Sequence, residues 1–404
     1  MKFHQNYYDN ITSHSGAKII LNEFITKKLP DYRNKRNFDY GSYNKNFVSG
    51  LSPAISKRII TEEMIVSEVS QFFSYRNVEK FIDEICWRTY WKGWLEHRPN
   101  VWEDYLVDLK ILKDRYKKDI SYTEAIRGGT NLDCFNQWSH DLKEYGYLHN
   151  HTRMWFASLW IFYFELPWQL GAEFFYKNLI DADPASNTLS WRWVAGLQTR
   201  GKTYITSKEN IDKFTNRRFE FPPNFNIKKK YIDDQKVYNP IPIQQVKSKS
   251  DNMSKGYLIY EEDLSLFNVK KDAPIIIQSE SYNPFGQERT PLNISNECLK
   301  NTIQICKTNY NSNTTTFTWD QSEIIKKWVI QNDISEIELS SPTVGKYKQM
   351  IPDVMNSLDL KYSYAHHDWD ISFWKYSDKG FFKLKKHIKN IISPLWEEPL
   401  FRKN

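Results

Sequence analysis

The stretch that decides the fold reads LIDADPASNTLSWRW over residues 179–193. Pro184 suits the first turn of a helix, so the sequence predicts a turn that leads directly into a helix. On that helix Asn187 and Trp191 lie one above the other, four positions apart. The carboxylates of Asp181 and Asp183 in the turn can accept hydrogen bonds from the imide and amine donors of a bound ring system, or pair with an arginine.

A second segment, GYLHNHTRMWFAS over residues 146–158, places polar groups on a strongly apolar helix. Asn150, Arg153 and Met154 share one face of this helix. Two interpretations stay open, namely a helix cap with a buried ion pair that the first segment completes, or a ligand site. His149 and His151 point in different directions on a helix, so no metal site is predicted.

A third segment, FIDEICWRTYW over residues 81–91, places Glu84, Trp87 and Arg88 on one helix face. A carboxylate, an indole and a guanidinium in this arrangement can read a base edge, stack on the base and hold a phosphate. The alternative is an ordinary Glu–Arg pair beside a core tryptophan. Spacing alone favours that alternative.

Hydrophobic periodicity divides the chain into a mainly α fold followed by a smaller α/β domain. Residues 1–215 have helical periodicity, for example over 61–75, 78–96, 134–146, 150–164 and 168–180. Residues 216–255 are rich in Lys, Arg and Pro, which indicates an extended basic linker. Residues 256–404 alternate expected strands at 257–260, 275–277, 334–339 and 358–362 with expected helices at 292–305, 320–331, 342–357 and 379–392. This alternation predicts a parallel sheet.

Composition sets broad limits on the class of protein. The 404 residues include 15 Trp, 25 Tyr and 24 Phe, so aromatic side chains are abundant enough both to fill a core and to stack on flat ligands. A net charge of +7 favours polyanionic partners. The four cysteines lack a CxxC pair and are expected as free thiols in a reducing compartment. The sequence shows neither a signal peptide nor a membrane span, which makes the cytoplasm the expected location.

Together these segments resemble the FAD-binding helical domain of the photolyase/cryptochrome family. The resemblance covers roughly residues 30–205 and includes five motifs in order, which are Tyr32-x-x-x-Arg36-Asn37, Val48-Ser-Gly-Leu-Ser-Pro53, Trp87-Arg88, Gly146-Tyr-Leu-His-Asn150 with Arg153-Met154, and the run from Asp181 to Trp193. It implies that FAD is the cofactor. The family's Arg in the serine turn is replaced here by Gly50.

The resemblance also implies roles for individual cofactor-binding residues. Groups that bind the FAD phosphates match Tyr32, Ser49, Leu51, Ser52 and Arg88. Residues beside the isoalloxazine match Asn150 and Arg153, with Asp181 as the ionic partner of Arg153. The acceptor of the flavin imide matches Asp183, and the residue facing flavin N5 matches Asn187.

Within the family, the substrate-pocket residues point to cyclobutane pyrimidine dimers. The dimer pocket of such photolyases matches Glu84, Trp87, Met154 and Trp193, and the inner electron-transfer tryptophans match Trp191 and Trp168. Six-four photolyases carry His at the positions of Asn150 and Met154, which disfavours that activity. The implied function is light-driven DNA repair by electron transfer from reduced FAD, a lyase reaction on UV-damaged DNA, by a monomer that needs no membrane. The alternatives are a cryptochrome-like blue-light sensor, a six-four photolyase, and a DNA-binding protein without flavin.

The domain order departs from that of the family. Photolyases place an α/β antenna domain before the helical domain, whereas here only about 30 residues precede the flavin motifs. The stretch Gly256-Tyr-Leu-Ile-Tyr resembles the first strand of the antenna domain. We therefore expect an antenna-like domain at 256–404, and the sequence does not identify an antenna chromophore.

Overall fold

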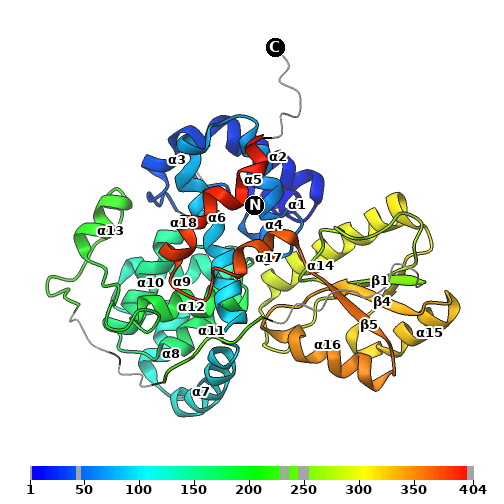
Figure 1. The fold of residues 1–404 in the computed structure, drawn as a ribbon. Helices are drawn as coiled ribbons and strands as arrows, with labels where there is room; N and C mark the ends of the chain where they lie inside the picture. The colour runs from blue at the N-terminus through cyan, green and yellow to red at the C-terminus, as the bar shows by residue number, and fades with distance from the viewer. Residues whose placement is uncertain (1, 42–46, 228–231, 233–235, 244–253, 398–404) are drawn as a thin grey trace.

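A helical part and a smaller α/β part make up the chain (Figure 1). The computed structural model describes residues 2–41, 47–227, 232, 236–243 and 254–397. The helices of the first part are α1 (Lys2–Ile11), α2 (His14–Lys27), α3 (Leu29–Lys35), α4 (Ser52–Ser56), α5 (Glu62–Ser70), α6 (Tyr75–Glu96), α7 (Asn100–Tyr116), α8 (Ile120–Arg127), α9 (Asp133–Tyr145), α10 (Asn150–Phe162), α11 (Trp168–Asn178), α12 (Pro184–Val194) and α13 (Lys208–Phe214). The five helices predicted from periodicity are confirmed.

Capping side chains fix the helix ends that matter for the site. Asp183 precedes α12 in an extended conformation, and its side chain accepts a hydrogen bond from the backbone N–H of Ser186 at 2.8 Å. Gly146 ends α9 in the left-handed conformation at φ 60°, which glycine adopts without steric cost. A Cβ at that position would lie 2.5 Å from the Ile180 side chain. The two turns that lead into α10 and α12 therefore lie against one another.

The α/β part contains a five-stranded sheet in the order β3-β2-β1-β4-β5, and all four pairings are parallel. The strands are β1 (Lys255–Ile259), β2 (Ile275–Gln278), β3 (Thr315–Phe317), β4 (Glu336–Ser340) and β5 (Tyr362–Ala365). Helix α14 (Arg289–Ile305) covers one face, and α15 (Glu323–Gln331) and α16 (Lys346–Ser357) cover the other (Figure 1). The predicted fold class, mainly α with a smaller parallel-sheet domain, is confirmed.

One strand was placed wrongly and one was missed. The expected strand at 358–362 instead contains the C-cap residue of α16, a turn, and only the first residue of β5. The apolar residue Leu358 is buried against the sheet from the helix end, so its hydrophobicity did not mark a strand. Strand β3 reads Thr-Thr-Phe and carries a single buried residue, Phe317, which gives too little hydrophobic periodicity to be recognised.

The two faces of the sheet belong to different cores. Tyr257 and Ile259 of β1 pack into the large core of the helical part, whereas Leu258 and Tyr260 pack into a separate core beneath α15 and α16. This alternation follows from the two-residue period of a strand. The α/β part is thus joined to the helical part through the face that α14 covers.

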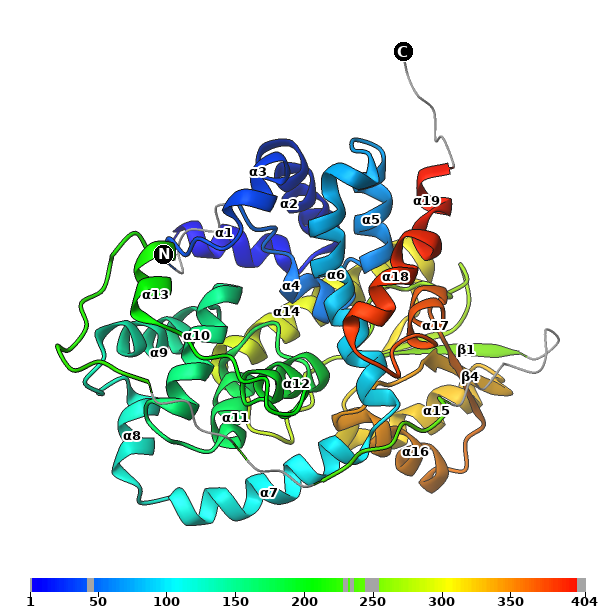
Figure 2. The same cartoon turned by 60° about the vertical axis from the view of Figure 1, so that its left-hand side comes forward.

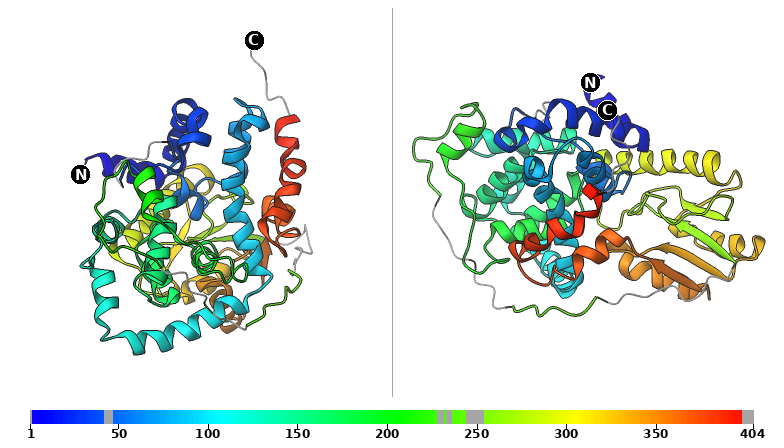
Figure 3. Two further views of the ribbon diagram at one scale, coloured as in Figure 1. Left: turned by 90° about the vertical axis from the view of Figure 1, so that its left-hand side faces the viewer. Right: turned by 45° about the horizontal axis from the view of Figure 1, so that its top comes forward.

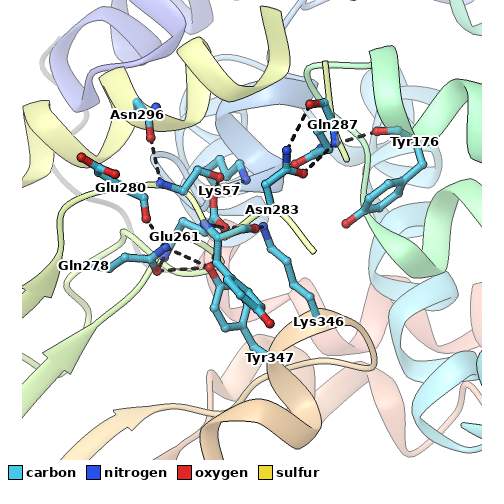
Figure 4. A network of polar contacts seen from close by, with 12 residues as sticks. Lys57, Tyr176, Glu261, Gln278, Glu280, Asn283, Gln287, Asn296, Lys346 and Tyr347 are labelled. Carbon is cyan, nitrogen blue, oxygen red and sulfur yellow. Dashed lines mark hydrogen bonds and ion pairs between the residues drawn. The ribbon is translucent and has the colours of Figure 1, made fainter. Parts of the chain in front are cut away.

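A buried polar network also joins the two parts at the carboxyl end of β1 (Figure 4). The Glu261 carboxylate is fully buried, pairs with Lys57 of the helical part at 3.4 Å, and accepts hydrogen bonds from Lys346 and from the Tyr347 hydroxyl. Burial raises the pKa of Glu261, but Lys346 and Lys57 outweigh that effect and hold it well below its ordinary value. Burial raises the pKa of the neighbouring Glu262 to about 7.

The last three helices leave the sheet and return to the helical part. Helices α17 (Asp368–Trp374) and α18 (Phe381–Ile392) pack on α6, and α19 (Pro394–Glu397) packs on α5 (Figures 2 and 3). The Trp369 indole donates a hydrogen bond to the Thr89 hydroxyl of α6 at 2.9 Å. The domain limits expected at 215 and 255 remain predictions. Residues 368–397 complete the wall of the helical part rather than the sheet.

Two further expectations concern the chain as a whole. All four cysteines are buried free thiols, as predicted. Of the helices that the structure describes, none combines the length and the apolar character needed to span a bilayer. The basic runs at 228–230 and 247–250 lie outside the described residues.

Candidate functional site

A cavity of about 600 Å³ lies among α3, α6, α10 and α12. Its size is typical of sites for small molecules and cofactors. The cavity brings together nearly all of the predicted site residues, namely Tyr32, Ser49, Ser52, Glu84, Trp87, Arg88, Asn150, Arg153, Met154, Asp181, Asp183, Asn187, Trp191 and Trp193. The three segments singled out in the sequence therefore line one site.

Two ion pairs between neighbouring helices form the polar end of the cavity. Arg153 Nη2 lies 3.0 Å from Asp181 Oδ2, and its Nε donates to the Leu148 carbonyl at 2.9 Å. Arg88 donates a hydrogen bond to Asp183. The predicted partnership of Arg153 with Asp181 is therefore present, while Arg88 pairs with a carboxylate that the resemblance assigned to the flavin imide.

Burial and charge act in opposite directions on the Asp181 carboxyl. Burial alone raises the pKa of Asp181, but the guanidinium groups of Arg153 and Arg88 outweigh burial and hold that pKa below its ordinary value. At the rim, burial lowers the pKa of His149 to about 4. The site at neutral pH thus combines ionised Asp181 and a neutral imidazole.

The polar groups of the cavity fit a large ring system with donors and acceptors at its edge. Within the described part of the chain, the buried Ser186 hydroxyl and the Trp191 indole N–H lack a hydrogen-bond partner. Asn187 donates from Nδ2 to the Ala172 carbonyl at 2.8 Å, so its side-chain oxygen is the group that can accept from a ligand. Buried polar atoms are rarely left unsatisfied, and FAD offers complementary atoms for them.

An aromatic wall forms the other end of the cavity. Trp87 stacks on Phe381 of α18 with ring centroids 3.7 Å apart and planes at 13°. Trp193 stacks on Tyr204 at 5.5 Å. Glu84, beside Trp87 on α6, lies 3.4 Å from Arg36 and 2.9 Å from Lys80.

Sequence reasoning missed Phe381 and gave no role to Arg36. Phe381 lies almost 300 positions after Trp87, so no local spacing connects them. Arg36 belongs to one of the quoted motifs, but its contact with Glu84 joins two helices that no local spacing connects.

Leu51 and Trp168 are the predicted site residues that lie outside the cavity lining. Leu51 is fully buried, and its backbone N–H donates to the Ser49 hydroxyl at 3.3 Å. Trp168 stacks on Tyr105 at 5.6 Å. Their roles remain predictions.

Trp191 is buried at the centre of an aromatic cluster. Its ring lies 5.0 Å from that of Phe175 and 6.1 Å from that of Trp160, and Trp160 in turn lies 6.0 Å from the half-buried Tyr122. Closely spaced aromatic rings thus connect Trp191 through Trp160 to Tyr122.

Comparisons with known proteins match much of the helical part of the chain. Residues 81–258 match the family model described as the FAD binding domain of DNA photolyase. A deoxyribodipyrimidine photo-lyase of Agrobacterium fabrum is 31% identical over 185 residues, which cover 45% of this chain and 38% of that protein. Another, from Alkalihalophilus pseudofirmus, is 25% identical over 244 residues, covering 57% of this chain and 48% of the relative. The chain thus spans less than half the length of these relatives.

Among solved structures, the crystal structure of a bacterial class III photolyase from Agrobacterium tumefaciens is similar over 50% of this chain and 43% of that chain, with 26% identity and a TM-score of 0.43. Residues 81–258 are thus similar to the FAD-binding domain of DNA photolyases, and this similarity supports FAD as the cofactor.

Proposed function

We propose that this protein splits cyclobutane pyrimidine dimers in DNA, using light and reduced FAD. The observation that carries the proposal is that the four residues matching a dimer pocket line the same cavity as the predicted flavin contacts. These four are Glu84, Trp87, Met154 and Trp193. A dimer held by them would lie in the same cavity as the cofactor, as electron transfer requires.

The chain's own residues bind, orient and shield the reactants. The pairs Arg153–Asp181 and Arg88–Asp183 fix the carboxylates that would accept hydrogen bonds from the ring system. Trp87 and Trp193 would stack on the two joined pyrimidines of one strand once they are flipped out of the duplex. Reduced FAD held by these residues would supply the electron-transfer chemistry.

Glu84 would contact the dimer bases. Its carboxylate is half-buried and already faces Arg36 and Lys80. These two cations hold it near Trp87 and balance its charge. As a carboxylate, Glu84 would accept hydrogen bonds from the N–H groups of the dimer bases.

An illuminated repair assay tests the proposal. Reduced protein is incubated with dimer-containing DNA under blue light, and loss of the lesion is measured. Glu84→Gln and Trp87→Ala should slow repair and weaken dimer binding while flavin content is unchanged. The matched control is Glu103→Gln on the exposed side of α7.

The outcomes separate the competing functions. Unchanged lesions with flavin bound would favour a blue-light sensor, for which the packing of α17 and α18 on α6 provides a contact between the cavity and the C-terminal helices. Repair of six-four photoproducts alone would contradict the substrate assignment. Repair that neither substitution affects would contradict the assigned pocket.

A further inference from the structure

Helix α7 forms an outer edge of the helical part of the molecule (Figure 2). Its buried side, which includes Trp102 and Tyr105, packs on α11. The opposite side carries four exposed side chains at intervals of four residues, namely Glu103, Val107, Ile111 and Arg115. Residues spaced by four positions form a continuous ridge along a helix, so these four side chains make up one ridge, the α7 ridge.

The centre of the α7 ridge is apolar. Val107 is 61% exposed and Ile111 is 54% exposed. The two side chains are neighbours on the helix surface because they lie four positions apart. Single apolar residues scattered over a surface are ordinary, whereas adjacent ones that are framed by charged groups are typical of an interaction surface. The α7 ridge therefore has the composition of a helix face that packs on a partner.

The two halves of α7 and its immediate continuation carry opposite charge. Residues 100–108 contain three acidic residues and no basic one, whereas residues 110–118 contain five basic residues and one acidic one. Within the described part of the chain, neither Glu103 nor Arg115 has an ion-pair partner. This order of charges favours the helix dipole, but the dipole gives no reason for the exposure of Val107 and Ile111.

A second copy of α7 in antiparallel orientation is complementary to the ridge. The ridge is centred on position 109, and a twofold axis at that position places Val107 of each copy opposite Ile111 of the other. The same axis places Glu103 of each copy opposite Arg115 of the other. Ridges of this four-residue kind interdigitate in the commonest class of helix packing. A parallel arrangement would set Glu103 against Glu103, so charge selects the antiparallel one.

We propose that two copies of this chain associate through their α7 ridges as an antiparallel pair. The association differs from the monomer that the resemblance implied. Because each copy contributes a single helix, the contact is smaller than a standard interface of about 1,600 Å², and we expect a dissociation constant on the order of 100 µM. None of the residues that line the cavity belongs to α7, so the inference is independent of the proposed function.

The test is sedimentation equilibrium of the full chain from micromolar to millimolar concentration. Glu103→Arg and Arg115→Glu should each weaken self-association about tenfold or more, because each sets like charges opposite one another at two equivalent contacts. An equimolar mixture of these two variants should recover an affinity within about threefold of the native one, since both opposite-charge contacts return in the mixed pair. Val107→Ser should weaken self-association about tenfold, because two apolar contacts are lost.

Matched controls change the same kinds of side chain elsewhere on the surface. Lys300→Glu on α14 alters a side chain that is 75% exposed, and Ile330→Ser on α15 alters one that is 71% exposed. Both should leave self-association unchanged, and circular dichroism verifies that every variant is folded. The proposal would be overturned by a protein that stays monomeric up to millimolar concentration, by charge reversals that do not weaken association, or by a mixture that associates no better than either variant alone.

Discussion

The ion pair between Arg153 and Asp181 should stabilise the empty and the flavin-bound site alike. Asp181→Asn removes a carboxylate whose side chain is only 2% exposed and leaves a guanidinium that is 23% exposed. Removal of one partner from a fully buried pair costs about 3–5 kcal/mol. Because water reaches Arg153, we expect a smaller loss than this range, about 2–3 kcal/mol in the free energy of unfolding.

The assay is urea unfolding followed by tryptophan fluorescence at neutral pH, with Arg153→Met and the double variant completing a cycle. We expect a coupling energy of about 1–2 kcal/mol between the two positions. The control is Asp31→Asn, whose partner Lys35 and own carboxylate are about half exposed, and it should cost less than about 0.5 kcal/mol.

The pH dependence has a definite sign. The pKa of Asp181 is lower in the folded than in the unfolded chain, so its stabilisation is complete above about pH 4 and is lost as the pH falls through the folded pKa. Two results would contradict a stabilising Arg153–Asp181 pair. One is that the effects of Asp181→Asn and Arg153→Met on the free energy of unfolding are additive, and the other is that Asp181→Asn lowers this free energy no more than Asp31→Asn does. Flavin content measured on the same variants should fall with Asp181→Asn.

Three further predictions concern the packing around the site. Gly171→Ala should destabilise the fold by about 1–3 kcal/mol in thermal unfolding, because its Cβ would lie 2.3 Å from the Trp191 ring, and an unchanged melting temperature would contradict this packing. Phe381→Leu should weaken dimer binding several-fold in a titration with flavin retained, since the stack on Trp87 is lost. Glu262→Gln should raise the free energy of unfolding by about 1–2 kcal/mol above pH 7. In the folded protein the Glu262 carboxyl keeps its proton up to about pH 7, whereas in the unfolded chain it ionises near pH 4.5. The free energy of unfolding of the native protein should therefore fall as the pH rises from about 4.5 to about 7, and this fall should be absent in Glu262→Gln.

The sequence was informative where local spacing determines geometry. Residues at three- and four-residue spacing on α6, α10 and α12 share one face each, and Asp183 is recognisable as the residue before a proline-initiated helix. Spacing alone favoured an ordinary Glu–Arg pair on α6, and only the family resemblance joined the three segments into one expected site. The cavity brings these segments together.

The sequence failed where the structure depends on contacts between distant segments. Nothing near Phe381 shows that it stacks on Trp87, and nothing near Arg58 shows that it pairs with Asp263 and Asp370 across the two parts. The return of α17–α19 to the helical part is of the same kind. Such contacts are set by tertiary packing, which leaves no periodic signal in the chain.

The most direct test of the central claim is the visible absorption spectrum of the purified protein, with its FAD content after denaturation. The account predicts flavin bands, an equimolar amount of FAD, and a higher melting temperature with the cofactor than without it. A folded, colourless protein that takes up no added FAD, and whose melting temperature FAD does not change, would contradict it.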